Sequence, residues 1–119
     1  MKDFRQLDVW RLGQELAVIV YRLTAPFPRE ERYGLTDQVR RAAVSIPANL
    51  AEGCGRAGDA DFARFVQIAF GSACELESLL LLCQELAFLK ATDHDMTQSK
   101  LSSVKRMLAA LLKKLKAER

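Results

Sequence analysis

Residues 33–55 read Tyr-Gly-Leu-Thr-Asp-Gln-Val-Arg-Arg-Ala-Ala-Val-Ser-Ile-Pro-Ala-Asn-Leu-Ala-Glu-Gly-Cys-Gly. Thr36 can cap the free N–H groups at the start of a helix, and the closing glycines can supply a left-handed stop. Pro47 lies well inside, where it has no N–H to donate to the carbonyl four residues back. Because the apolar period continues unchanged past Pro47, we expect one helix over 36–53 that bends there, in preference to a restart capped by Ser45.

The segment before this one has the apolar spacing of a helix face. Its large apolar residues recur at steps of three, four, three and four, in the order Val9, Leu12, Leu16, Ile19 and Leu23. Pro26 and Pro28 disfavour helical geometry in the residues that precede them. We therefore expect a helix over residues 8–24, followed by a charged loop.

A long third helix is expected to begin after Asp59, a good N-cap residue, and to continue to about Phe88. At 1.5 Å per residue it would be a rod of roughly 42–45 Å. Five consecutive apolar residues, Leu79-Leu80-Leu81-Leu82-Cys83, should point in every direction around its axis. One small bundle cannot cover them all, so we expect a copy of the same chain to cover the remainder, with Leu79, Leu81 and Leu82 at the interface.

A fourth helix is expected after a turn at residues 90–93, with Asp95 and Gln98 spaced as a capping box. Its apolar residues again recur at steps of three and four, in the order Leu101, Val104, Leu108, Leu111 and Leu115. Short connections between successive helices imply antiparallel neighbours. The sequence therefore predicts an all-α fold, an antiparallel up-down-up-down four-helix bundle, in a single domain over residues 1–119.

Composition agrees with one small globular domain. The chain has 119 residues, of which 50% are hydrophobic and 28% charged, enough for one core. No uninterrupted apolar run reaches the roughly 18 residues of a membrane span, and the first residues lack the apolar stretch of a secretory signal, so we expect a cytoplasmic protein without membrane contact. Cys74 and Cys83 are interpreted as buried core residues, and Cys54, between two glycines, as the more exposed candidate for a reactive thiol.

The sequence offers no pattern for catalysis. The single histidine, His94, is expected in a loop between two aspartates, so the carboxylate-bridged metal site of helical bundles cannot be built. No serine has a base at useful spacing, and the glycines of residues 53–58 lack the lysine and the preceding strand of a phosphate-binding loop. We therefore expect a protein that is not an enzyme and that holds no cofactor and no metal.

Charge gives the only functional indication from the residues themselves. Residues 100–119 hold seven lysines and arginines against Glu118 alone, whereas the rest of the chain is acidic overall. Helical geometry places most of these cations away from the leucine face, as a candidate strip for RNA or DNA phosphates made of Lys105, Arg106, Lys113, Lys114 and Lys116. The alternative is a solvated surface that complements the helix dipole.

Two further cations, Arg40 and Arg41, are candidates for the same role. Asp37 stands four residues before Arg41, which is also the spacing of an ordinary surface ion pair. Because the C-terminal segment has no aromatic residue on which bases could stack, any binding is expected to be directed at the phosphate backbone and to be sensitive to salt.

Several motifs resemble one bacterial family, namely Phe4-Arg5-Gln6-Leu7-Asp8-Val9-Trp10, Tyr33-Gly34-Leu35-Thr36, Ser45-Ile46-Pro47-Ala48-Asn49-Leu50-Ala51-Glu52-Gly53 and Glu75-Leu76-Glu77. They are similar to four-helix-bundle proteins first noticed as products of intervening sequences inside large-subunit ribosomal RNA genes. Members have been labelled ribosomal proteins because of where some of their genes lie. The family's activity is not established.

The resemblance implies a homopentamer, and a distant likeness to the accessory protein of diversity-generating retroelements, a basic pentamer that binds nucleic acid and a reverse transcriptase. Phe70 departs from the polar or basic residue of many relatives, so we expect it to join the oligomer interface. Two functions stay open. One is a non-enzymatic homo-oligomer that binds RNA or DNA, including as an adaptor for a nucleic-acid enzyme, and the other is a purely structural or protein-binding oligomer.

Overall fold

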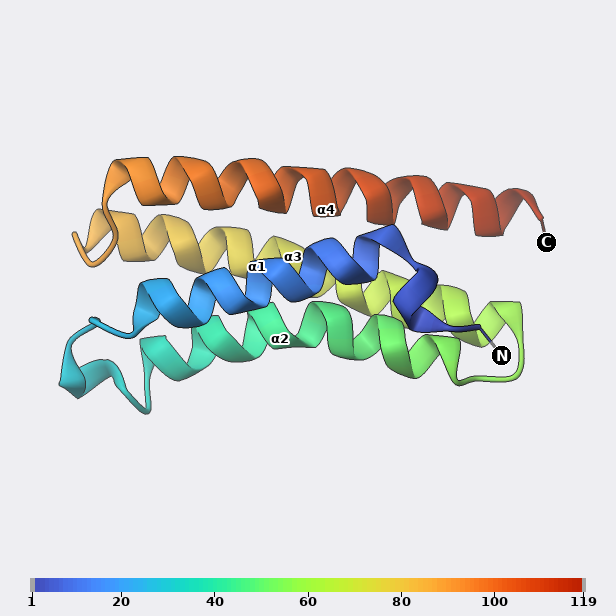
Figure 1. Cartoon of the computed structure of the whole chain (residues 1–119), viewed down its shortest axis with the longest axis horizontal. Coiled ribbons are helices and arrows are strands. Elements are labelled where there is room, and N and C mark those ends of the chain that lie inside the picture. Colours follow the sequence, from blue (N-terminus) through green and yellow to red (C-terminus); the bar gives the residue numbers. More distant parts are fainter. Residues whose placement is uncertain (1, 119) are drawn as a thin grey trace.

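The computed structural model describes residues 2–118, which form helices and no strand. The four long helices are α1 (Asp8–Thr24), α2 (Leu35–Cys54), α3 (Asp59–Glu85) and α4 (Ala91–Ala117), with two short 3-10 helices, η1 (Phe4–Gln6) and η2 (Arg29–Glu31). Figure 1 shows the helices along the longest axis, with the α1–α2 and α3–α4 connections at one end and the α2–α3 connection and both termini at the other. The prediction of an all-α protein with four helices is confirmed.

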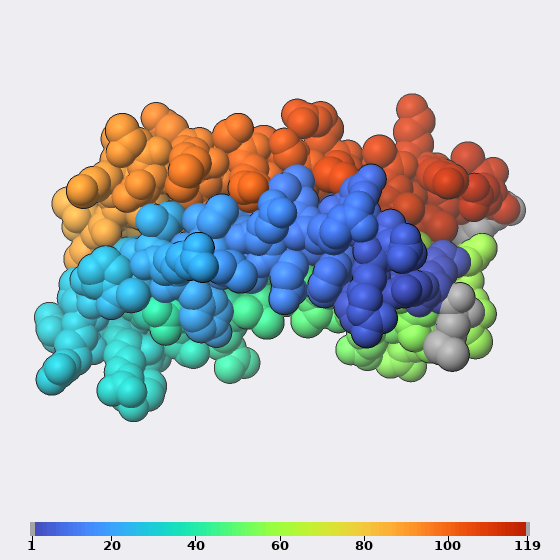
Figure 2. All heavy atoms as spheres, in the orientation of Figure 1, coloured from blue at the N-terminus to red at the C-terminus, as the bar shows by residue number. Residues whose placement is uncertain are grey.

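Each long helix packs against two others. Helices α1 and α3 both contact α2 and α4, so α1 and α3 are diagonal to each other. Figure 2 shows one face of this arrangement, on which α1 lies between α4 and α2. Fully buried side chains from all four helices meet in one core, among them Leu16, Ile46, Leu76 and Leu108. The molecule measures 45 × 24 × 19 Å.

The predicted bounds of α1 match the structure, whereas α2 begins one residue earlier and ends one residue later than predicted. The residue before α2 is Gly34, and no side chain caps the helix, so the prediction that Thr36 caps it is wrong. The Glu31 carboxylate instead accepts a hydrogen bond from the backbone N–H of Leu35, at 3.3 Å. Glu31, in the turn before α2, therefore bonds to one of the free N–H groups that Thr36 was expected to cap.

Helix α2 continues through Pro47 as one element, so the alternative of a restart at Ser45 is wrong. The Asn49 side-chain amide donates to the backbone oxygen of Ser45 at 2.8 Å, which adds a hydrogen bond beside the proline. Gly13 of α1 lies against this region, where a Cβ atom would be 3.3 Å from Cγ2 of Ile46. A bend at Pro47 stays a prediction.

Gly53 has a different role from the one predicted. It lies inside α2, and no glycine of the described residues has a positive φ, so it is not a left-handed stop. A Cβ atom at Gly53 would lie 2.8 Å from Cβ of Phe65 and 3.1 Å from Cδ1 of Phe62, both on α3. The residue is small because the two helices approach closely, not because the backbone turns.

Helix α3 begins and ends earlier than expected. Its N-cap is Gly58, so the prediction that Asp59 is the cap is wrong, and Asp59 is the first helical residue. The helix ends at Glu85, short of Phe88, because Ala87 adopts a φ of 63°. The backbone N–H of Phe88 donates to the carbonyl of Cys83 at 2.9 Å, which satisfies one of the last free carbonyls of the helix.

Helix α4 begins at Ala91 without a side-chain cap, so the predicted capping box is wrong. Asp95 lies inside the first turns, and Gln98 donates across to Glu77 of α3 at 2.7 Å. His94, expected in a loop, is a helical residue that is 6% exposed.

Helix α3 is the one described helix that is long and apolar enough, by length and composition, to cross a membrane. Glu75 and Glu77 interrupt its middle, and its buried face packs against α2 and α4. A core helix of a bundle passes the same test, so this composition is explained by the packing.

Candidate nucleic-acid interface

The face of α4 that points away from the core carries most of the predicted basic strip. Leu101, Val104 and Leu108 are fully buried, which turns the opposite side of the helix to solvent. Arg106, Lys113, Lys114 and Lys116 are exposed, and Lys116 lies on the flank of α4 beside α3, where it lines a shallow hollow with Arg64. None of these four forms an ion pair with a described residue, and Arg106 only donates to Ser103, a neutral side chain, at 3.2 Å.

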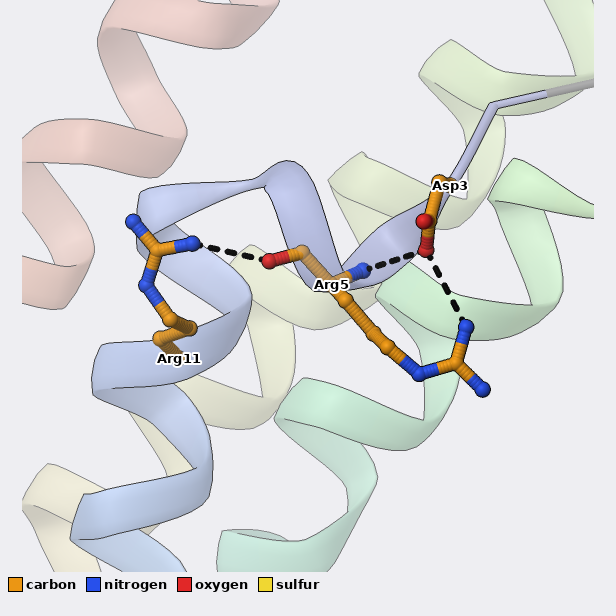
Figure 3. Close-up of polar contacts among 3 residues, drawn as sticks. All are labelled: Asp3, Arg5 and Arg11. Carbon is orange, nitrogen blue, oxygen red and sulfur yellow. Dashed lines mark hydrogen bonds and ion pairs between the residues drawn. The ribbon is translucent and has the colours of Figure 1, made fainter.

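Other cations near the same end of the bundle are paired with acids. Figure 3 shows Asp3 accepting from the backbone and the guanidinium of Arg5, while Arg11 donates to the carbonyl of Arg5. Arg11 also pairs with Asp8. Further pairs join Lys2 to Asp59, Arg56 to Glu52 and Arg64 to Asp61. The uncompensated positive charge at this end therefore comes from α4.

Lys105 does not belong to this exposed strip. Its Nζ lies 2.7 Å from Oε1 of Glu77 on α3, and it is 5.9 Å from the centre of the Phe70 ring. The hydrogen bond from Lys105 lowers the pKa of Glu77, and the same bond raises the pKa of Lys105. Lys105 thus serves to join α3 to α4, and its charge is already balanced.

Replacing Glu77 by glutamine is expected to lower the stability at neutral pH by up to about 1 kcal/mol, because the pair is partly screened by solvent. Since the folded-state pKa of Glu77 is lowered, its contribution is present above the ordinary value of 4.5 and is lost as the pH falls through the folded-state pKa. Thermal unfolding of both proteins from pH 7 to pH 3 checks this. The difference in Tm between the wild type and the variant should become smaller at acidic pH. A difference that stays constant would show that loss of the ion pair is not its cause.

Arg40 and Arg41 lie near the start of α2, at the opposite end from the α4 C-terminus (Figure 1). The Arg40 Nε donates to the Thr24 hydroxyl at 2.8 Å, and its guanidinium lies 4.6 Å from the centre of the Tyr21 ring. Arg41 is exposed, and among the described residues it forms no ion pair with Asp37, so the expected surface pair is wrong. These two arginines do not share a surface with Lys113–Lys116.

The predicted interface residues fall into two groups. Leu79 is 9% exposed and Phe70 is half-buried against the core, so packing within one chain already covers these two side chains and they need no second copy to bury them. Leu81 and Leu82 are 49% and 41% exposed, and Leu86, which the sequence analysis did not single out, is 47% exposed. We call Leu81 and Leu82, together with Leu86 directly after the end of α3, the α3 face.

A second apolar surface lies along α1 and α2, and the sequence analysis missed it. Val18, Tyr21 and Val44 are each more than two-fifths exposed, and they line an open groove of about 390 Å³ that reaches Pro47. We call these three residues the α1–α2 face. The sequence does contain a signal for this surface, namely apolar residues that fall outside the regular apolar spacing of their helix. Val18, between Leu16 and Ile19, is an example.

The cysteines differ from expectation at two positions. Cys54 is 1% exposed, and desolvation raises its pKa, so the interpretation of it as the exposed, reactive thiol is wrong. Cys74 is exposed on α3, although it was expected in the core. Cys83 is buried as predicted, and burial raises its pKa to about 11.

No cluster of three or more histidine, cysteine, aspartate or glutamate residues that could hold a metal occurs within residues 2–118. Ser45 and Ser72, which had no base nearby in sequence, hydrogen-bond to each other at 2.7 Å between α2 and α3. Asn49 donates to the Ser45 hydroxyl at 2.9 Å. This small polar network joins two helices.

Comparisons with known proteins agree with the fold. A solved structure from Bacteroides thetaiotaomicron, described as a protein of unknown function from the S23 ribosomal protein family, superposes with a TM-score of 0.79. It shares 22% sequence identity, and the match covers 88% of this chain and 98% of that one. No curated protein matches in sequence. The family model of the 23S rRNA-intervening sequence protein matches residues 5–110, and the chain therefore belongs to that family.

Proposed function

We propose that the protein is a non-enzymatic, cytoplasmic homo-oligomer, a pentamer of up-down-up-down bundles, that binds the phosphate backbone of RNA or DNA. The single observation that carries this proposal is the set of exposed cations on α4 that have no acidic partner within residues 2–118. Three of them, Lys113, Lys114 and Lys116, lie at an end of the bundle where other cations are paired with acids. A surface that serves only solubility can carry acidic and basic residues side by side, because mixed charges keep a protein soluble. Solubility therefore does not account for the absence of acidic partners around these cations.

Two apolar faces support assembly with further copies of the chain. The α1–α2 face and the α3 face involve the diagonal helices α1 and α3, so they point in different directions. A closed ring of more than two copies needs two different complementary surfaces on each copy, whereas a dimer needs only one. Two separate apolar faces therefore favour a ring in which the α1–α2 face of one copy covers the α3 face of the next.

A ring would repeat the α4 strip once per copy. Nucleic-acid affinity from backbone contacts grows with the number of phosphates that are neutralised, so several weak strips together would bind far better than one. The protein could then act as an adaptor that brings a nucleic-acid enzyme to its template. The alternative is a purely structural or protein-binding oligomer, which the same apolar faces would also support.

Binding of a labelled single-stranded RNA and a DNA duplex across a range of salt concentrations distinguishes the two functions. The proposal predicts binding at low salt that weakens steeply as salt is added, with log K falling linearly against log salt concentration. The slope should be steeper than four phosphate contacts, one for each α4 cation of a single chain, would give. Binding that is absent at low salt, or that has a flat dependence on salt, would reject the nucleic-acid role and favour the structural alternative.

A further inference from the structure

A second basic site lies at the other end of the molecule. A pocket of about 250 Å³ is formed where the end of α1, the η2 loop and the start of α2 meet. Arg29, Arg32 and Arg40 line it, together with Thr24 and Thr36, and no acidic residue does. None of the three arginines forms an ion pair with a described residue. Three arginines thus line one hollow, and no carboxylate-bearing residue lines it with them.

Arg40, one of the arginines that line the pocket, is held in place. Arg40 donates from Nε to the Thr24 hydroxyl at 2.8 Å and from Nη2 to the carbonyl of Tyr21 at 3.3 Å, while its third nitrogen, Nη1, has no partner among the described residues. The Thr24 hydroxyl in turn donates to the carbonyl of Val20 at 2.8 Å. A positioned guanidinium with free N–H groups loses little entropy when it binds an oxyanion.

Polar groups of α2 add to the same site. Thr36 lines the pocket and is 7% exposed, and its buried hydroxyl has no hydrogen-bond partner. It is the second residue of α2, where free backbone N–H groups and the helix dipole favour negative charge. Two carboxylates lie near this helix start. Glu31 accepts from the N–H of Leu35 and Asp37 is in the first turn of α2, and neither residue lines the pocket. A buried hydroxyl without a partner is unusual, and it leaves a hydrogen-bonding group at this pocket that a ligand can use.

The loop that carries two of the arginines is anchored. Phe27 is 9% exposed and packs against Phe88 with ring centres 5.6 Å apart. Pro28, which also lines the pocket, fixes its own backbone angle. The site is therefore largely formed before a ligand binds, which reduces the entropic cost of binding.

We propose that this pocket binds a small phosphate monoester through Arg29, Arg32, Arg40 and Thr36. Arginine is the side chain that best matches phosphate oxygens in paired hydrogen bonds. The volume lies just below the range of ordinary small-molecule pockets, which suits a phosphate group with a small organic substituent. The α1–α2 connection, whose residues line the pocket, lies at the end of the bundle remote from the α4 C-terminus (Figure 1), so the proposal is independent of nucleic-acid binding by α4.

Calorimetric titration and thermal unfolding at constant ionic strength test this site. The probes are inorganic phosphate, adenosine 5′-monophosphate and adenosine, with chloride as the reference anion. We expect both phosphate compounds to raise Tm with concentration, as mass action requires, and adenosine and chloride to have no effect. A rise with inorganic phosphate alone would assign the site to the free anion and overturn the monoester. An equal rise with chloride would show screening only.

The variant Arg29→Gln/Arg32→Gln should bind phosphate at least tenfold more weakly. Both side chains are exposed, so the unliganded protein should keep its Tm. The matched control Arg22→Gln/Arg41→Gln removes the same charge from exposed arginines of α1 and α2 that do not line the pocket, and it should bind as the wild type does. Equal losses in both variants would overturn the proposal. Replacement of Lys113, Lys114 and Lys116 should leave phosphate binding unchanged, which separates this site from the α4 strip.

Discussion

Replacing Lys113, Lys114 and Lys116 together by glutamine is expected to weaken nucleic-acid binding at least tenfold at physiological salt. All three side chains are exposed on α4, and none has an acidic partner among the described residues, so their full charge is available to phosphates. Each lost phosphate contact should reduce the slope of log K against log salt concentration by about 0.9 on duplex DNA. The slope should therefore fall by about 3 for each chain that contacts the duplex.

The salt slope separates a direct contact from an indirect effect. Lys90→Gln removes an exposed lysine at the opposite end of α4 and should leave both affinity and slope unchanged. Lys105→Gln should also leave the slope nearly unchanged, because Lys105 is paired with Glu77. If the triple variant kept the wild-type slope, or if Lys90→Gln reduced it equally per charge, the α4 strip would not be the binding surface.

Replacing Gly53 by alanine is expected to destabilise the fold by about 2 kcal/mol, with a fall in Tm of roughly 8 °C. The added Cβ would lie 2.8 Å from Cβ of Phe65, an atom that cannot move without its backbone, so α2 and α3 must separate. This substitution normally stabilises a helix by roughly 0.5–1 kcal/mol, which makes the opposite sign informative.

Gly71→Ala is the matched control, because Gly71 lies inside α3 and an added Cβ would have no atom within 4 Å. This change should raise the stability by roughly 0.5–1 kcal/mol. Urea unfolding of the two variants and the wild type measures both effects. A Gly53→Ala protein as stable as the wild type would contradict the close approach of α2 and α3.

Element positions could be predicted from the sequence because the apolar period of each helix is regular and the breaks are chemically explicit. Pro26 and Pro28 end α1 where expected, and the apolar face of α4 is buried as its spacing indicates. Caps were predicted poorly. Residue type alone favoured Thr36, Asp59 and Asp95, but the N-cap residues are Gly34, Gly58 and Lys90, and none of the three helices has a side-chain cap.

The basic strip was predicted in part. Helical geometry correctly predicted that Arg106, Lys113 and Lys116 are exposed on α4. It could not identify Lys105 as an internal partner of α3, because Glu77 is 28 residues away in sequence. The arginine pocket was out of reach for the same reason, since its cations are brought together only when α1, η2 and α2 meet.

The apolar patches show a similar limit. Five consecutive apolar residues correctly indicated that part of α3 would stay exposed, and Leu81 and Leu82 do. The sequence could not show which of the five would be buried, because that depends on how α2 and α4 pack against α3, and Leu79 is buried. The α1–α2 face was missed because single apolar residues outside a stripe are common on protein surfaces.

Sedimentation velocity at low micromolar concentration and near-physiological salt tests the proposed assembly most directly. We predict one discrete species with a mass several times the 13.4 kDa of the chain, five times for a pentamer. The separate variants Val18→Asp and Leu82→Asp should each reduce that mass, since each new charge would be buried in one of the two faces. A stable, soluble wild-type monomer of 13.4 kDa would contradict the account.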